Sequence, residues 1–248
     1  MSCKVMGIVN VTPDSFSDGG QFFRPEEAVR RAKNLIADGA DIIDLGGEST
    51  RPGATPLGWE EEWARLEPVI RGLKDMRRQT PDVTVSVDTY PPETAARAIA
   101  AGAKIVNCVY AGPIPEMVRV IADAGQDTEL VMPYRLGDED FRRETLGSSL
   151  ASRLYLDPMI GFNTTREEDV ALLRSVPELA KRGRVLVGAS RKRIVKKLTG
   201  EKLTGKNVGG NIGIAVWAAL NGASVVRVHD VKETVQALRV IDQLKGEG

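Results

Sequence analysis

The sequence predicts an α/β fold, a single-domain (β/α)8 TIM barrel that spans residues 1–248. Three observations favour this fold class. Eight short apolar segments alternate with segments of helical periodicity, and 248 residues is a typical length for such a barrel. Six of the apolar segments end on a polar side chain, as barrel strands do where they face a ligand. The first apolar segment is not followed by the glycine-rich phosphate loop that an open doubly wound sheet usually carries.

The first strand and the loop after it begin this pattern. Val5–Val9 has the length and apolar content of a buried strand, and it ends at Asn10. A long stretch rich in Thr, Pro, Asp, Ser and Gly follows, whereas most such connections have about 2–6 residues. That length favours a ligand-binding loop. The first helix is expected over 25–39, because Pro25 and two acidic residues mark its start and Gly39 marks its end.

The same alternation continues to the end of the chain. Further strands are expected where short apolar runs end at turn residues, at 41–47, 83–89, 104–109, 129–133, 153–158, 184–188 and 225–231. Further helices are expected where apolar residues recur at helical spacing, at 58–79, 91–102, 114–125, 138–153, 165–182, 211–221 and 231–245. A helical turn is expected over 191–199.

The composition excludes several classes of protein. Lys plus Arg equals Asp plus Glu at 34 each, which argues against nucleic acid or a membrane surface as the main partner. Cys3 and Cys108 lie far apart without the spacing of a zinc site, so reduced thiols are expected. No segment has the pattern of a signal peptide or the length of a membrane span. We therefore expect a soluble cytoplasmic protein.

Polar residues at the ends of the expected strands form the candidate site. In a barrel these positions converge on one face, and here they are Asn10, Asp44, Asp88, Asn107, Asp157 and His229. A buried carboxylate without a partner is costly, so three acids together indicate a ligand with N–H donors or a metal. A flat heterocycle with an amidine-like edge would suit them. Any one of these residues alone would more simply be a strand-end cap or half of a salt bridge.

Cationic groups are expected on the same face. Arg51 follows the second strand, and Ser190, Arg191 and Lys192 follow the seventh. Arg227 and His229 are two residues apart on the eighth strand, so their side chains face the same way. Arg and His together near the last two loops indicate a phosphate or pyrophosphate pocket. Alternatively, Arg227 pairs with an acid inside the barrel.

Six motifs give the chain a specific resemblance. MGIVNVTPDSFSDGG, DLGGESTRPGA, SVDT, LDPMIGF, SRK and RVHDV occur in this order, and they resemble the dihydropteroate synthase family of pterin-binding barrels. The resemblance covers nearly the whole chain. It implies a transferase that joins 6-hydroxymethyl-7,8-dihydropterin pyrophosphate to 4-aminobenzoate in folate biosynthesis. The implied cofactor is Mg²⁺. The implied partners are these small molecules and a second copy of the chain.

The resemblance also implies roles for individual residues. Asp44, Asp88, Asn107, Asp157 and Lys192 would hold the pterin. The pyrophosphate would be bound by Asn10, Arg227 and His229, with Mg²⁺ at Asn10. The 4-aminobenzoate site would be lined by Thr50, Arg51, Pro52 and Ser190. The residues assigned to catalysis are Asp88, Lys192 and Arg51.

The chain departs from the family pattern at the pterin-side loops. The family usually has Asn-Asp after the fourth strand and Met-His at the end of the fifth, where this chain has Cys108 and Pro133 as the second residues. The usual Asp-Pro-Gly-x-Gly-Phe-Gly-Lys segment carries Met159, Asn163 and Thr164 in place of two glycines and a lysine. These changes favour, as alternatives, a reduced-folate methyltransferase or a pterin-binding paralogue without synthase activity.

A homodimer is expected from the resemblance. Its members commonly pair through helices late in the barrel, and helix 211–221 carries Ile212, Ile214, Val216, Trp217 and Leu220. The same residues could pack inward instead.

Overall fold

The computed structural model describes residues 3–12, 24–48, 56–76, 83–108, 114–134 and 150–246. Parallel strands follow one another in chain order and close into a barrel, which confirms the predicted fold class. The strands are β1 (Lys4–Asn10), β2 (Ile42–Gly46), β3 (Thr84–Asp88), β4 (Ile105–Asn107), β5 (Glu129–Pro133), β6 (Leu154–Asp157), β7 (Arg184–Val187) and β8 (Val225–Val228).

The chain divides into two compact units. The first unit comprises Met1–Gly7, Asp38–Ala40 and Met132–Gly248, and the second unit comprises Ile8–Ala37 and Asp41–Val131. Each unit has its own buried strands and its own layer of helices.

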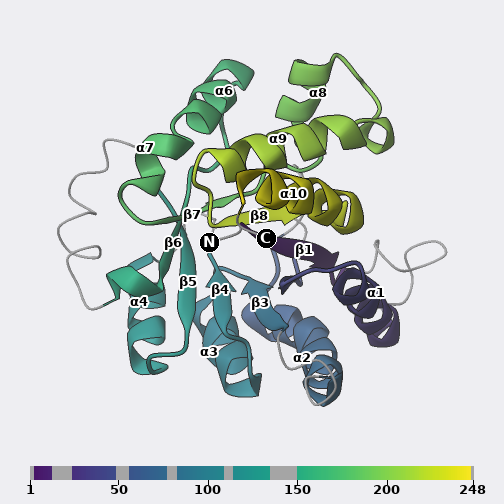
Figure 1. Cartoon of the computed structure of the whole chain (residues 1–248). Helices are drawn as coiled ribbons and strands as arrows, with labels where there is room; N and C mark the ends of the chain where they lie inside the picture. The colour runs from purple at the N-terminus through teal and green to yellow at the C-terminus, as the bar shows by residue number, and fades with distance from the viewer. Residues whose placement is uncertain are drawn as a thin grey trace. The chain divides into compact units, whose positions relative to one another are not determined.

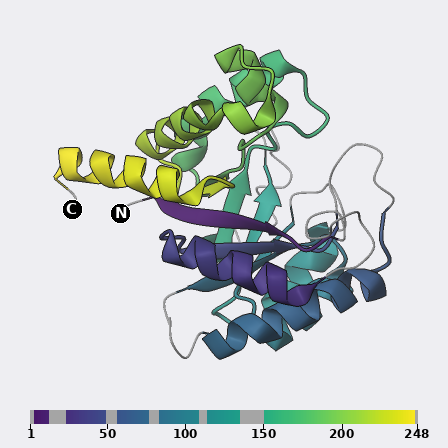
Figure 2. The ribbon, with the colours of Figure 1, turned by 90° about the vertical axis from the view of Figure 1, so that its right-hand side faces the viewer.

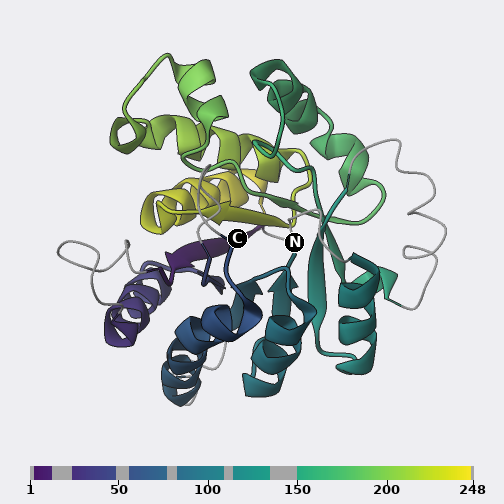
Figure 3. The same ribbon diagram turned by 180° about the vertical axis from the view of Figure 1, so that it is seen from behind.

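In the second unit, β2, β3 and β4 are nearly fully buried because helices cover them. The helices are α1 (Pro25–Ala37), α2 (Trp59–Met76), α3 (Pro92–Ala101) and α4 (Ile114–Asp123). Each packs on the next along the chain, and Figure 3 shows α2 and α3 side by side. The face that α2 buries carries Leu66, Val69, Ile70 and Leu73, as its helical spacing predicts. Trp63 is only half-buried, and Glu62 takes the fully buried place on this face.

In the first unit, the helices pack around β6, β7 and β8. They are α6 (Arg166–Arg174), α7 (Val176–Ala180), α8 (Arg193–Thr199), α9 (Val208–Leu220) and α10 (Val231–Lys245), with 3-10 turns η3 (Ala151–Arg153) and η4 (Thr204–Lys206). The helices α9 and α10 run side by side, as Figures 1 and 2 show. Strands β7 and β8 end at Val187 and Val228, so Ser190 and His229 lie on the loops that follow them.

The observed elements differ from the expected ones in a few places. The helix expected over 165–182 is divided at Ser175, because Pro177 in the first turn of α7 cannot continue the hydrogen bonding of α6. The turn expected over 191–199 is a regular helix, α8, in which Ile194 and Val195 are fully buried. Helix α9 begins at Val208 and not at 211. Most of the helix expected over 138–153 lies outside the described residues, and 151–153 is the turn η3.

Candidate active site

In the second unit, strand register places two of the candidate residues, Asp88 and Asn107, at the same level. Gly46 is the partner of Asp88, and Asp88 is the partner of Asn107. Asp44 is the partner of Ser86, one layer further from the strand ends. The side-chain nitrogen of Asn107 donates a hydrogen bond of 3.0 Å to Oδ2 of Asp44. This bond joins the two layers.

Asp44 and Asn107 are both completely buried. The oxygen Oδ1 of Asn107 accepts no hydrogen bond from any residue that the structure describes. A buried acceptor of this kind is costly unless a donor reaches it, so it indicates a binding position for an N–H group. Asp88 is only partly buried and lies at the end of β3, where a ligand can reach it.

A second set of acids in this unit was not predicted from the sequence. Glu62 on α2 is 2% exposed, and the hydroxyl of Thr89 donates to its Oε2 at 2.8 Å. Burial raises the pKa of Glu62, hydrogen bonds from Thr94 and Thr89 lower it, and the nearby charge of Glu48 raises it further. The spacing of Glu62 with Leu66 on the apolar face of α2 was the signal that could have revealed it.

Glu48 connects two segments of the same unit. Its carboxylate accepts hydrogen bonds from the hydroxyl of Tyr90 at 3.1 Å and from the backbone N–H of Leu57 at 2.9 Å. Tyr90 follows Asp88 by two residues. Through Glu48, these bonds therefore connect the end of β3 to the backbone just before α2. Thr50, Arg51 and Pro52, which the sequence assigns to 4-aminobenzoate, lie outside the described residues.

In the first unit, Asp157 and Lys192 form the centre of a second polar group. Asp157 is 4% exposed, and its Oδ1 accepts the backbone N–H of Met159 at 2.7 Å. Burial raises the pKa of Asp157, whereas the charge of Lys192, the N–H of Met159 and the charge of Arg227 lower it. The charges of Lys192 and Arg227 therefore both act on Asp157.

The side chain of Lys192 contacts the segment that follows β6. Its ammonium donates to the carbonyl oxygen of Ile160 at 2.6 Å and lies 4.0 Å from the centre of the Phe162 ring. A Cβ atom at Gly161 would lie 2.9 Å from Cδ of Lys192. The segment after β6 thus fixes the position of the cation that follows β7.

The same segment has unusual backbone geometry. Met159, Gly161 and Asn163 have φ angles of 64°, 78° and 50°, in the left-handed region that favours glycine. The oxygen Oδ1 of the buried Asp169 accepts both the N–H of Gly161 and the hydroxyl of Thr164, each at 2.6 Å. Thr164, at the position of the family's lysine, therefore attaches this segment to α6. Sequence reasoning missed Asp169.

Ser190 and His229 are in direct contact. The Ser190 hydroxyl oxygen lies 3.1 Å from Nδ1 of His229 and accepts the backbone N–H of His229 at 3.3 Å. The next residues in each loop, Arg191 and Asp230, form an ion pair with an N–O distance of 2.6 Å. Sequence reasoning placed Ser190 with 4-aminobenzoate and His229 with pyrophosphate, and it did not foresee that the two side chains would meet.

Asn10 ends β1 with an exposed side chain, and its amide oxygen is the kind of ligand that Mg²⁺ accepts. Over the ranges that the structure describes, no three His, Cys, Asp or Glu side chains gather as a metal would require. One protein oxygen is compatible with Mg²⁺ because this ion usually keeps several waters and binds substrate phosphates. No helix that the structure describes has both the length and the apolar character of a membrane span.

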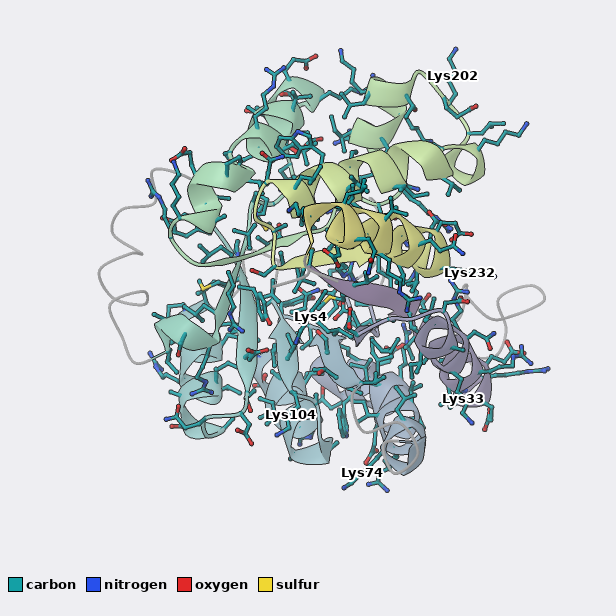
Figure 4. The ribbon with its side chains drawn as sticks, viewed as in Figure 1. Lys4, Lys33, Lys74, Lys104, Lys202 and Lys232 are labelled. Carbon is teal, nitrogen blue, oxygen red and sulfur yellow. The ribbon has the colours of Figure 1, made fainter. Side chains whose placement is uncertain are left out.

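A cavity of about 380 Å³ lies elsewhere in the second unit. It is lined by residues that precede β4 and β5, including Lys104, Gly125 and Thr128. Lys104, labelled in Figure 4, pairs with the exposed Asp127 at 3.4 Å. This cavity lies at the opposite strand ends from Asn107 and contains none of the predicted site residues.

Known proteins resemble this chain over nearly its whole length. A family model described as "Pterin binding enzyme" matches residues 6–148 and 144–229. The dihydropteroate synthase of Streptococcus pyogenes serotype M6 is 36% identical, over 98% of this chain and 96% of that protein.

Solved structures are similar as well. The dihydropteroate synthase of Xanthomonas albilineans with 4-aminobenzoic acid has a TM-score of 0.87 and 39% identity, over 100% of this chain and 95% of that one. The structure of the same organism's enzyme with 7,8-dihydropteroate has a TM-score of 0.82 and 36% identity, over 98% and 94%.

Proposed function

Because the chain belongs to the pterin binding enzyme family, we propose that it is a dihydropteroate synthase, a transferase of folate biosynthesis. It would join 6-hydroxymethyl-7,8-dihydropterin pyrophosphate to 4-aminobenzoate and release pyrophosphate. The observation that carries the proposal is the buried Asp44–Asn107 pair, whose amide oxygen has no donor among the described residues. A pterin has N–H and NH₂ groups along one edge, which supply such donors. We take residues 1–248 as one pterin-binding barrel domain.

Substrate binding follows from the groups described above. The pterin is assigned to the acids and amide of the strand ends and to a lysine: Asp44, Asp88, Asn107, Asp157 and Lys192. Arg227 and His229 supply the positive charge and the N–H donor for pyrophosphate, and Asn10 supplies the oxygen for Mg²⁺. Thr50, Arg51, Pro52 and Ser190 are assigned to 4-aminobenzoate. The assignment of Thr50, Arg51 and Pro52 rests on the sequence motif alone.

The chemistry requires charge stabilisation more than proton transfer. As pyrophosphate leaves, its negative charge is stabilised by the positive charge of Arg227 and the N–H donor of His229, and the methylene group of the pterin becomes positive. The carboxylate of Asp88 favours that positive charge, while Lys192, held by Ile160 and Phe162, orients the ring. Mg²⁺ bound at Asn10 would supply further charge neutralisation on the leaving group. The arylamine is a neutral nucleophile at neutral pH, so Arg51 needs only to place it.

Product analysis tests the proposal directly. The purified protein is mixed with Mg²⁺, dihydropterin pyrophosphate and 4-aminobenzoate, and dihydropteroate and pyrophosphate are measured together. Equal amounts of both products are expected. Pyrophosphate without dihydropteroate, or neither product from folded protein, would refute the synthase. Omission of Mg²⁺, with EDTA present, is expected to reduce the rate strongly.

A reduced-folate methyltransferase is the second candidate. It is favoured by the residues around Asp157 that depart from the family pattern, above all Met159 and Thr164. It predicts that Arg227→Ala hardly changes the binding of methyltetrahydrofolate. The synthase predicts that the same variant loses pyrophosphate binding, so one titration of each ligand distinguishes the two.

We also infer that the protein is a cytoplasmic homodimer formed through α9. This helix buries small side chains, Ala215 and Ala218, and leaves Trp217 and Leu220 36% and 48% exposed. Exposed apolar residues on one helix are typical of a subunit interface. Light scattering is expected to give the mass of a dimer, and a Trp217→Glu/Leu220→Lys variant to give a monomer. Leu244→Lys on α10, where the side chain is 80% exposed, is the control that stays dimeric.

A further inference from the structure

Asn211, on the first turn of α9, contacts the loops after β7 and β8, which carry Ser190 and His229. Its side chain is 3% exposed. The amide oxygen accepts the backbone N–H of Arg191 at 2.9 Å, and the amide nitrogen donates to Oδ2 of Asp230 at 2.9 Å. Only one orientation of the amide satisfies both bonds, because the flipped amide would place its NH₂ group against the N–H of Arg191 and its oxygen against the carboxylate of Asp230. Nothing in the sequence motifs points to this residue.

The contacts of Asn211 are adjacent in sequence to the Ser190–His229 pair. Arg191 follows Ser190, and Asp230 follows His229. Arg191 also donates from its guanidinium to Oδ1 of Asp230 at 2.6 Å, so both oxygens of this carboxylate are used. With φ at 61°, Arg191 has a left-handed backbone that these bonds must hold in place. The two loops are thus fixed to each other at two successive levels.

The first of these levels places the Ser190 hydroxyl against the histidine ring. The Ser190 oxygen already accepts the backbone N–H of His229, and its proton is then available for Nδ1 of the ring at 3.1 Å. A hydroxyl that donates to Nδ1 requires the neutral ring to carry its own proton on Nε2. An Nε2–H group is a donor, which is what an anionic ligand needs.

We propose that Asn211 is a positioning residue that, through Arg191 and Asp230, holds Ser190 against His229 and fixes the histidine as its Nε2–H tautomer. The tautomer is a property of the protein without ligand, whereas the role of the Nε2–H group in pyrophosphate binding rests on the function proposed above. The two can therefore fail separately.

His229 is the only histidine in the sequence, which makes a direct test possible. With ¹⁵N-labelled protein, long-range ¹H–¹⁵N spectra show a single imidazole, and the shifts of its two nitrogens report which one carries the proton. The spectrum is recorded at about pH 8.5, well above the usual imidazole range near 6.5. We expect the Nε2–H tautomer to predominate. Predominance of the Nδ1–H tautomer would overturn the proposal.

Two substitutions of Asn211 test the positioning role. Asn211→Asp keeps the acceptor for Arg191 but places a carboxylate against Asp230, and Asn211→Leu removes both bonds. Both are expected to give a mixture of tautomers. Asn221, at the other end of α9, bonds only within its own helix, so Asn221→Asp and Asn221→Leu are matched controls that keep the spectrum of the unmodified protein.

Kinetics add a second readout. We expect kcat/KM for dihydropterin pyrophosphate to fall tenfold or more in Asn211→Asp, towards the roughly hundredfold that a displacement of about 1 Å can cost. Circular dichroism checks that the variants are folded. Folded Asn211 variants with an unchanged tautomer would refute the positioning role. Absence of synthase activity in the unmodified protein would refute only the proposed function, because the spectra do not depend on it.

Discussion

The ammonium nitrogen of Lys192 lies 4.0 Å from the centre of the Phe162 ring, and Gly161 lies beneath the aliphatic part of the same side chain. The contact links two loops that are 30 residues apart in the sequence, from Phe162 to Lys192. It makes the position of this lysine depend on the absence of a side chain at Gly161.

Replacing Gly161 with alanine is therefore expected to impair both folding and catalysis. The left-handed backbone, with φ at 78°, costs a residue with a Cβ about 1–2 kcal/mol, and the new atom would lie 2.9 Å from Cδ of Lys192. Urea unfolding should show that loss, and kcat/KM should fall tenfold or more. Gly125→Ala is the matched control, because φ is 83° and no atom lies within 4 Å of its added Cβ. If both variants keep full activity, the contact with Lys192 does not matter.

Glu62→Gln should alter the dependence of stability on pH. Burial raises the pKa of Glu62 above 4.5, so the folded chain binds this proton more tightly than the unfolded chain does. The free energy of unfolding of the unmodified protein then falls as pH rises from 4.5 through the raised pKa. Glutamine does not titrate, so the variant should gain stability relative to the unmodified protein across that window. Urea titrations at several pH values measure the difference, and a difference that stays constant across that window would contradict the raised pKa of Glu62.

Glu62→Ala tests the hydrogen bonds of the same carboxylate. The hydroxyl of Thr89 would lose its acceptor inside the unit, which typically costs about 1–3 kcal/mol. A lower urea midpoint with an unchanged slope is expected. An unchanged midpoint would mean that water replaces the carboxylate.

Asp157→Asn should separate binding from folding. The substitution keeps the shape of the side chain and its acceptor for the N–H of Met159 but removes the charge next to Lys192. A hydrogen bond to a charged group is worth about 1.5–3 kcal/mol, so kcat/KM should fall roughly 10- to 100-fold while the protein stays folded. Calorimetric titration with a pterin gives the matching loss of affinity. Asp127→Asn, in an exposed ion pair, should leave both quantities unchanged.

Cys108 should be unreactive in the folded protein. Burial, and secondarily the charge of Asp88, raises the pKa of its thiol to about 12. Alkylation requires the thiolate, so iodoacetamide near pH 8 should modify Cys108 only after unfolding in guanidinium. Peptide mass spectrometry distinguishes it from the partly exposed Cys3. Rapid labelling of Cys108 under native conditions would contradict the burial of β4.

Element bounds could be predicted where both ends carry a signal. The strand 129–133 and the helix 231–245 are observed with the predicted bounds, and Gly246 ends that helix in a left-handed conformation. The helix over 165–182 was predicted as one piece because its apolar periodicity continues past Ser175. Pro177 ends that continuity, and a local steric effect of this kind outweighs periodicity.

The candidate site was predictable to the extent that strand direction determines it. Asp88 and Asn107 lie at matching ends of neighbouring strands, as their positions in the sequence require. Contacts between loops were not predictable, because Ser190 and His229 are 39 residues apart and meet only through the tertiary fold. Glu62 was missed although its spacing with Leu66 placed it on a buried face. The roles assigned to Thr50, Arg51 and Pro52 stay predictions.

The segment from Met159 to Thr164 affects how relatives of this protein are recognised. Its backbone makes left-handed turns at two positions where the family has glycine, although the side chains here are Met159 and Asn163. Asp169 secures the segment from α6, and such anchoring lets the conformation persist after the residues that usually favour it have been replaced. A genome search that required both glycines would discard this sequence, and with it other chains that keep the turn by a similar anchor.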